Sequence, residues 1–179
     1  MAQAQPVWVI THEENRSAIE SYLQINPTPH PIHFEYVSLP RWLHRLLSHG
    51  YTLFNIQYYL WILLASRAAN RLHERVGFDV VQHVSLMRWW MPSPGAALAK
   101  RGVKFVFGPV GGGELMPSKF RAGIGLGARL GETLRKAAVS CWSFDPLLRR
   151  TVRRATVVLA STPETAAHLS SFRPKAVLT

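Results

Sequence analysis

The sequence has little cysteine, and its amino terminus lacks the pattern of a secretion signal. Cys141 is the only cysteine, so an intrachain disulfide and a metal site built from several thiolates are both excluded. The first residues, Met-Ala-Gln-Ala-Gln-Pro, contain neither the basic region nor the apolar region of a secretion signal. Because a protein without disulfides fits a reducing compartment, we expect a cytoplasmic location.

Long apolar runs are missing as well. The most apolar helical segment covers residues 51–65, but Asn55 and Gln57 interrupt it. It is also shorter than the about 20 residues that a helix needs to cross a bilayer. This segment is therefore predicted to be a core helix or a helix that touches a membrane surface.

Acidic residues are scarce relative to basic ones. The chain has 21 Lys and Arg against 10 Asp and Glu, a formal charge of +11. Such a charge attracts nucleic acids, nucleotide phosphates and anionic membranes, and does not by itself distinguish them. One basic cluster lies at residues 149, 150, 153 and 154, and arginines 67, 71 and 75 recur every four residues along a predicted helix. A solvated helix face explains the second group better than an anion-binding ridge does.

Several nucleotide- and nucleic-acid-binding motifs are also missing. No glycine-rich stretch continues into Gly-Lys-Ser/Thr, and none has the spacing of the dinucleotide fingerprint, which argues against P-loop enzymes and dinucleotide-dependent oxidoreductases. Helix-turn-helix, RNP and zinc patterns do not accompany the arginines, so we expect no specific nucleic-acid partner. A non-catalytic basic module that binds polyanions remains the alternative function.

What the chain does have is a regular alternation of strand and helix patterns. Strands are predicted at residues 6–11, 33–39, 78–85, 104–107, 156–162 and 176–179, with helical segments between them. Three helix starts are predicted from capping patterns: Thr11 with Glu14, Asp145 with Pro146, and Thr162 with Pro163. The alternation predicts a single α/β domain over residues 1–179, a Rossmann-like three-layer sandwich with a mostly parallel sheet.

The most distinctive stretch is Lys104-Phe-Val-Phe-Gly-Pro-Val-Gly-Gly-Gly-Glu114, in which a strand pattern runs into glycines. In α/β sheets, ligands gather at the carboxyl ends of the strands, and free N–H groups there can face a phosphate or a sugar oxygen. A merely flexible turn is the competing interpretation of three adjacent glycines.

Aromatic and basic residues follow the strand at residues 78–85. Arg88, Trp89 and Trp90 are suited to the wall of a sugar or lipid site, and packing of the two tryptophans beneath the sheet is the competing interpretation. His83, at the carboxyl end of the same strand, is either a hydrogen-bonding group or a buried structural histidine.

In its order of motifs, the chain resembles the amino-terminal domain of family 4 (group 1) glycosyltransferases, which have the two-domain GT-B architecture. The resemblance rests on Trp8-Val-Ile-Thr-His-Glu-Glu-Asn-Arg16, Phe78 to Ser85 with Arg88-Trp89 and Pro92-Ser93, Gly108-Pro-Val-Gly-Gly-Gly-Glu114, and Ala155 to Thr165. It implies a retaining transfer of sugar from a nucleotide-sugar to a polysaccharide or lipid-linked acceptor, with no metal or other cofactor.

The resemblance also implies roles for individual residues. Gly108, Gly111, Gly112 and Gly113 would line the cleft near the donor diphosphate or the transferred sugar, and Glu114 would orient a hydroxyl. His83 would act with Glu114 as a catalytic residue, while Arg88 and Trp89 would contact the acceptor.

Two departures from the family pattern affect this expectation. The family's domain normally begins one strand earlier, and its carboxyl-terminal domain, which holds most of the nucleotide-sugar, has no counterpart here. The strand at 78–85 also differs, because many relatives have histidine where Gln82 stands, and others at the position of Val84. We therefore expect a fragment that is inactive alone. Its basic and aromatic helices at residues 41–76 are expected to make peripheral contact with an anionic membrane.

Overall fold

The computed structural model describes residues 6–47, 51–84, 89–112, 125, 127 and 144–179. The chain divides into two compact units, Met1–Gly77 and Phe78–Thr179. The single domain expected over residues 1–179 stays a prediction.

The first unit is built around two parallel strands. β1 (Val7–His12) pairs with β2 (Ile32–Val37), and the register runs from Val7 opposite Ile32 to His12 opposite Val37. Parallel neighbours need a crossover connection, which here contains the 3-10 helix η1 (Glu13–Asn15) and α1 (Arg16–Ile25). Helices α2 (Arg41–Leu47) and α3 (Tyr51–Val76) follow β2.

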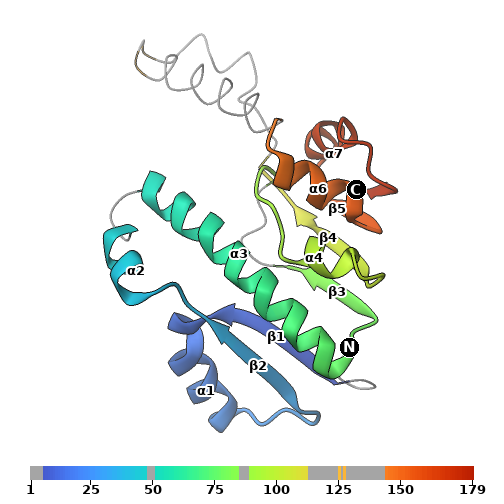
Figure 1. Cartoon of the computed structure of the whole chain (residues 1–179). Helices are drawn as coiled ribbons and strands as arrows, with labels where there is room; N and C mark the ends of the chain where they lie inside the picture. The colour runs from blue at the N-terminus through green and yellow to red at the C-terminus, as the bar shows by residue number, and fades with distance from the viewer. Residues whose placement is uncertain (1–5, 48–50, 85–88, 113–124, 126, 128–143) are drawn as a thin grey trace. The chain divides into compact units, whose positions relative to one another are not determined.

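Helix α3 provides most of the first unit's core and contacts both strands and α2 (Figure 1). Its buried residues recur at helical spacing along one stripe: Gln57, Tyr58, Trp61, Ile62, Ala65, Ala68, Ala69 and Leu72. The Trp61 indole N–H donates to the carbonyl oxygen of Val37 at 2.8 Å, which ties the helix to the end of β2.

The exposed side of α3 carries both arginines and apolar residues, among them Ile56 and Leu63. Arginines 67, 71 and 75 are all exposed, as expected for a solvated helix face. Among the helices that the structure describes, none combines the length and the apolar character required to cross a membrane.

The second unit contains a four-stranded parallel sheet in the order β3-β4-β5-β6. Its elements are β3 (Val80–His83), α4 (Gly95–Ala99), β4 (Lys104–Val110), α6 (Pro146–Arg154), β5 (Val157–Ala160), α7 (Pro163–Ser170) and β6 (Val177–Leu178). The core joins the central strands to α6, α7 and Trp89, through residues that include Phe105, Phe107, Val110, Leu148, Val152, Val158 and Leu169. Buried parallel strands of this kind are typical of α/β proteins.

The predicted fold class is confirmed at the level of a mixed α/β fold with parallel sheets and helices between the strands. Two predicted helix caps are also confirmed. The Asp145 carboxylate accepts from the N–H groups of Leu147 and Leu148, and the Thr162 hydroxyl accepts from the N–H of Thr165.

The predicted capping box at Thr11 is wrong. β1 continues through Thr11 to His12, and the His12 ring accepts from the N–H of Glu14 to cap η1. Thr11 instead accepts a hydrogen bond from the Asn15 side chain at 2.9 Å. The pattern misled because an imidazole nitrogen can cap a helix as an oxygen does, one position later than expected.

Candidate functional site

The strand before the glycine stretch is longer than predicted, because β4 continues past residue 107 through Gly108 and Pro109 to Val110. The loop therefore begins at Gly111. Gly108 is buried, has φ +137° and lies in a cis peptide bond with Pro109. A Cβ atom added at Gly108 would lie 2.8 Å from Leu159 Cβ and 3.0 Å from the Leu159 carbonyl carbon. Gly108 therefore allows β4 and β5 to pack closely, and its own carbonyl oxygen accepts from the Gln82 side chain at 3.2 Å.

The exposed corner consists of Gly111 and Gly112, directly after β4. Gly111 is half-buried beside Ser161, the first residue after β5, and Gly112 is exposed with φ +89°. Val110 is fixed from the same side, because its carbonyl oxygen accepts from both the N–H and the hydroxyl of Ser161, at 2.8 and 3.0 Å. The corner thus brings together the carboxyl ends of two neighbouring parallel strands.

Trp89 supports the corner from below rather than lining an open wall. Its side chain is buried, with the residue only 1% exposed, and its ring stacks on His168 of α7 with centroids 5.2 Å apart. Its backbone N–H donates to the Gly111 carbonyl oxygen at 3.1 Å. A Cβ at Gly112 would lie 3.9 Å from Trp89 Cδ1. The alternative in which the tryptophan is a packed core residue therefore agrees with its burial.

Of the remaining predicted site residues, the structure describes only His83. His83 ends β3, is half-buried, and its ring centroid lies 6.4 Å from that of Phe107 on β4. Arg88, Gly113 and Glu114 lie outside the described residues. The structure thus brings together Gly111, Gly112 and Trp89, with Gly108 one step further into the sheet.

A basic hollow lies on α6. It has a volume of about 340 Å³ and is lined by Pro146, Arg149, Arg150, Arg153 and Arg154. Leu148, Thr151 and Val152 face the core, which turns the arginines outward. Burial and the neighbouring charge of Arg150 lower the pKa of Arg154, so an anion bound here would relieve repulsion between cations.

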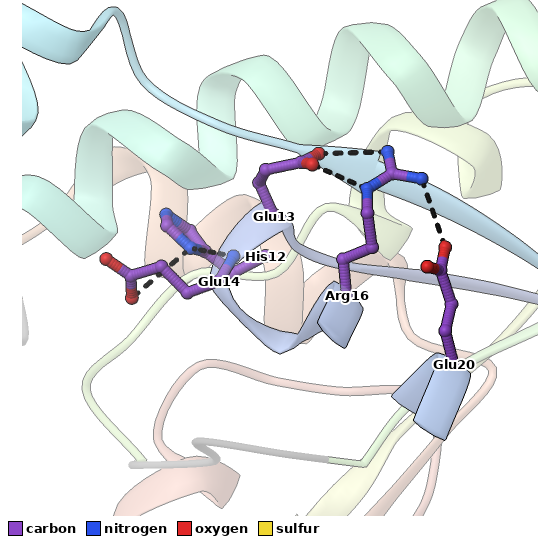
Figure 2. A network of polar contacts seen from close by, with 5 residues as sticks. All are labelled: His12, Glu13, Glu14, Arg16 and Glu20. Atoms are coloured by element: carbon purple, nitrogen blue, oxygen red, sulfur yellow. Dashed lines mark hydrogen bonds and ion pairs between the residues drawn. The ribbon is translucent and has the colours of Figure 1, made fainter. Parts of the chain in front are cut away.

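A polar network occupies the carboxyl end of β1 in the first unit (Figure 2). Arg16 forms a double contact with Glu13, at 2.6 and 3.2 Å, and a third hydrogen bond with Glu20 at 3.3 Å. The hydrogen bond from Arg16 lowers the pKa of Glu13. The Glu14 carboxylate contacts two histidines instead, at 3.5 Å from His12 Nδ1 and 2.7 Å from His44 Nε2.

The sequence interpretation missed three contributions to these sites. Ser161 and His168 meet the corner only because β5 pairs with β4, and His44 meets His12 and Glu14 only because α2 folds back on β1. His12 and Glu14, close together in the run Thr-His-Glu-Glu, could have pointed to a polar cluster. His44 lies 32 residues after His12, and so sequence spacing does not connect it with them.

Comparison with known proteins gave no match to a protein-family model, to a curated protein or to a solved structure.

Proposed function

We propose that the chain is the sugar-handling half of a glycosyltransferase of the GT-B type, acting on a nucleotide-sugar and a polysaccharide or lipid-linked acceptor. The observation that carries the proposal is the corner at Gly111 and Gly112, where exposed backbone stands at the carboxyl ends of adjacent parallel strands. Ligands of α/β sheets bind at this edge, because the helix N-termini and free N–H groups gather there. As part of this proposal, the strands and helices form a three-layer Rossmann-like sandwich.

Each described residue has a specific role in this proposal. The N–H groups of Gly111 and Gly112 donate to a sugar or phosphate oxygen, since no Cβ blocks the approach. The Ser161 hydroxyl donates to Val110 and keeps lone pairs that accept from a sugar hydroxyl. The N-terminus of α7, which follows at Pro163, favours a phosphate nearby.

Other roles rest on the family resemblance alone. His83 would hydrogen-bond the sugar or acceptor, Glu114 would orient a hydroxyl, and Arg88 would contact the acceptor. Gly113 would line the cleft near the donor diphosphate or the transferred sugar. Since the resemblance assigns the donor nucleotide mainly to a second domain, we expect the 179-residue chain to bind sugars without turning them over.

A matched pair of variants tests this function. Gly112→Ala and Gly102→Ala both place a side chain on an exposed glycine with φ +89°, so both carry the same kind of backbone strain. Only Gly112 belongs to the corner; a Cβ at Gly102 meets nothing within 4 Å. Binding of a panel of nucleotide-sugars and oligosaccharides is measured by saturation-transfer NMR. We expect binding by the parent chain and Gly102→Ala and weakened binding by Gly112→Ala; no binding by the parent chain would refute the proposal.

The arginine hollow favours a second candidate function, a basic module that binds polyanions. Arg149 and Arg150 are exposed on α6, whereas Arg153 and Arg154 each donate through one guanidinium nitrogen to a backbone carbonyl oxygen, of Phe172 and Ala96. The remaining N–H groups of this cluster suit sulfate or phosphate groups spaced along a polymer. The double variant Arg149→Gln/Arg150→Gln is compared with Arg67→Gln/Arg71→Gln, which removes the same charge from the exposed face of α3. A heparin oligosaccharide at several salt concentrations serves as the probe. Loss of affinity in the α6 variant alone supports a localised site, whereas equal losses would show that only net charge matters.

A further inference from the structure

A histidine-carboxylate cluster in the first unit has the composition of a zinc site. His12 ends β1, Glu14 lies in η1 and His44 lies in α2. One ligand atom from each residue lies within 4.8 Å of the other two. Two imidazoles and one carboxylate form a ligand set that binds zinc in proteins, with a fourth position left for water.

The distances suit a small tetrahedral ion. Zinc bonds of about 2.0–2.1 Å place neighbouring ligand atoms roughly 3.3 Å apart. His12 Nδ1 lies 3.5 Å from Glu14 Oε2, close to that separation, and His44 Nε2 lies 2.7 Å from the other carboxylate oxygen, Oε1, so a small rotation of the carboxylate brings one oxygen to both histidines. The second contact is a direct hydrogen bond, which opens by less than an ångström when a metal replaces its proton.

The tautomer of His12 is already the one that coordination requires. Nδ1 accepts the Glu14 N–H at 3.3 Å, so the proton of a neutral ring lies on Nε2, and the lone pair of Nδ1 becomes available to a metal when this hydrogen bond is given up. The 3.3 Å hydrogen bond is long, and is therefore easily exchanged for a metal bond.

The surroundings leave Glu14 available as a ligand. Its neighbour Glu13 is engaged by Arg16, which also binds Glu20 (Figure 2). The Arg16 guanidinium lies 4.0 Å from the centre of the Tyr36 ring. Glu14 and His44 are 64% and 31% exposed at their side chains, so an ion reaches them from solvent. The carboxylate supplies one negative charge toward a divalent ion, and nitrogen ligands select zinc over magnesium or calcium.

We propose that His12, Glu14 and His44 form a zinc site that joins α2 to the carboxyl end of β1. Nδ1 of His12, the carboxylate of Glu14 and Nε2 of His44 are the protein ligands. His12 Nε2 is buried and has no hydrogen-bond partner among the described residues, so the support that a second shell gives to a ligating histidine is missing there. Since such support is worth about 10–100-fold in affinity, we expect binding weaker than in a closed structural zinc site.

The test uses the full chain, without a histidine tag and treated with a chelator. Zn²⁺ is titrated by calorimetry, and Co²⁺ replaces it so that the intense visible bands of a four-coordinate ion report the geometry. We expect one equivalent of metal, at least about tenfold weaker binding for His44→Ala and Glu14→Gln, and a melting temperature that rises with zinc in the parent chain only. His30→Ala, which removes another histidine of the same unit, is the matched control and should bind as the parent does.

Two outcomes would overturn the proposal. One is the absence of a stoichiometric binding event in the parent chain, and the other is equal binding by His44→Ala and His30→Ala, which would place the metal on scattered histidines. Glu14→Gln guards against misfolding, because it keeps the size of the side chain and its hydrogen bond to His44; circular dichroism checks each variant.

Discussion

Replacing Gly108 by alanine tests how the glycine stretch is divided between packing and ligand binding. The new Cβ would meet the backbone and Cβ of Leu159 on β5, at 3.0 and 2.8 Å, in a residue with φ +137°. These Leu159 atoms cannot move away by a side-chain rotation, because the backbone and Cβ are fixed by the position of Leu159 within β5, which pairs with β4 and β6. We therefore expect the second unit to be strongly destabilised.

The magnitude has two parts. Forcing an extra carbon into a packed region costs about 1–3 kcal/mol, and placing a side chain at positive φ costs about 1–2 kcal/mol. Together they lower the free energy of unfolding by about 2–5 kcal/mol, a large share of the stability of a small domain. Gly102→Ala, with φ +89° and open space around the new Cβ, carries only the second part.

Urea unfolding followed by circular dichroism measures both variants in the same unit. Gly108→Ala should unfold at a lower midpoint than Gly102→Ala, with the two free energies differing by about 1–3 kcal/mol. Equal destabilisation would refute the reasoning, because it would mean that the contact with Leu159 relaxes without cost.

Three further predictions concern stability. Burial raises the pKa of Tyr58 to about 12, so the unfolded chain ionises first; stability should fall by about 2–3 kcal/mol as pH rises from about 10 to 12, and Tyr58→Phe should abolish this fall in unfolding experiments. Asp145→Ala removes the cap of α6 and should cost about 0.5–2 kcal/mol by urea unfolding, whereas Asp145→Asn should restore most of it. Trp61→Phe leaves the carbonyl of Val37 without its indole donor; it should cost about 1–3 kcal/mol, seen as a lower melting temperature, and no change would show that water replaces the bond.

Much of the fold was predictable, because it depends on local patterns. β-branched runs such as Thr156 to Thr162 predict buried strands, and the pairs Asp145-Pro146 and Thr162-Pro163 fix helix starts through side-chain hydrogen bonds within three residues. The end of β4 was harder to predict. Gly108 and Pro109 have low strand propensity, and they fall at a register shift between Phe107 and Val110, whose pairing with β5 holds the strand on either side.

The candidate sites were less predictable than the fold. Gly111 and Gly112 are visible in the sequence, but Ser161 and His168 reach them only through tertiary packing. Trp89 shows the same limit: its sequence context suits a binding wall, whereas the structure buries its ring. Residue type and spacing indicate which functional groups one segment offers. Tertiary contacts decide which groups from different segments come together in a site.

The position of β1 within its sheet has a consequence for the exchange of its amide hydrogens with solvent. Among the described strands, β1 pairs with β2 alone, whereas β4 lies between β3 and β5. In a parallel pair, alternate N–H groups of a strand point to opposite sides, so β1 offers every second N–H to β2. Deuterium uptake should therefore be slow at every second residue of β1, where the N–H is donated to β2, and slow at successive residues in the centre of β4, which has a partner on each side.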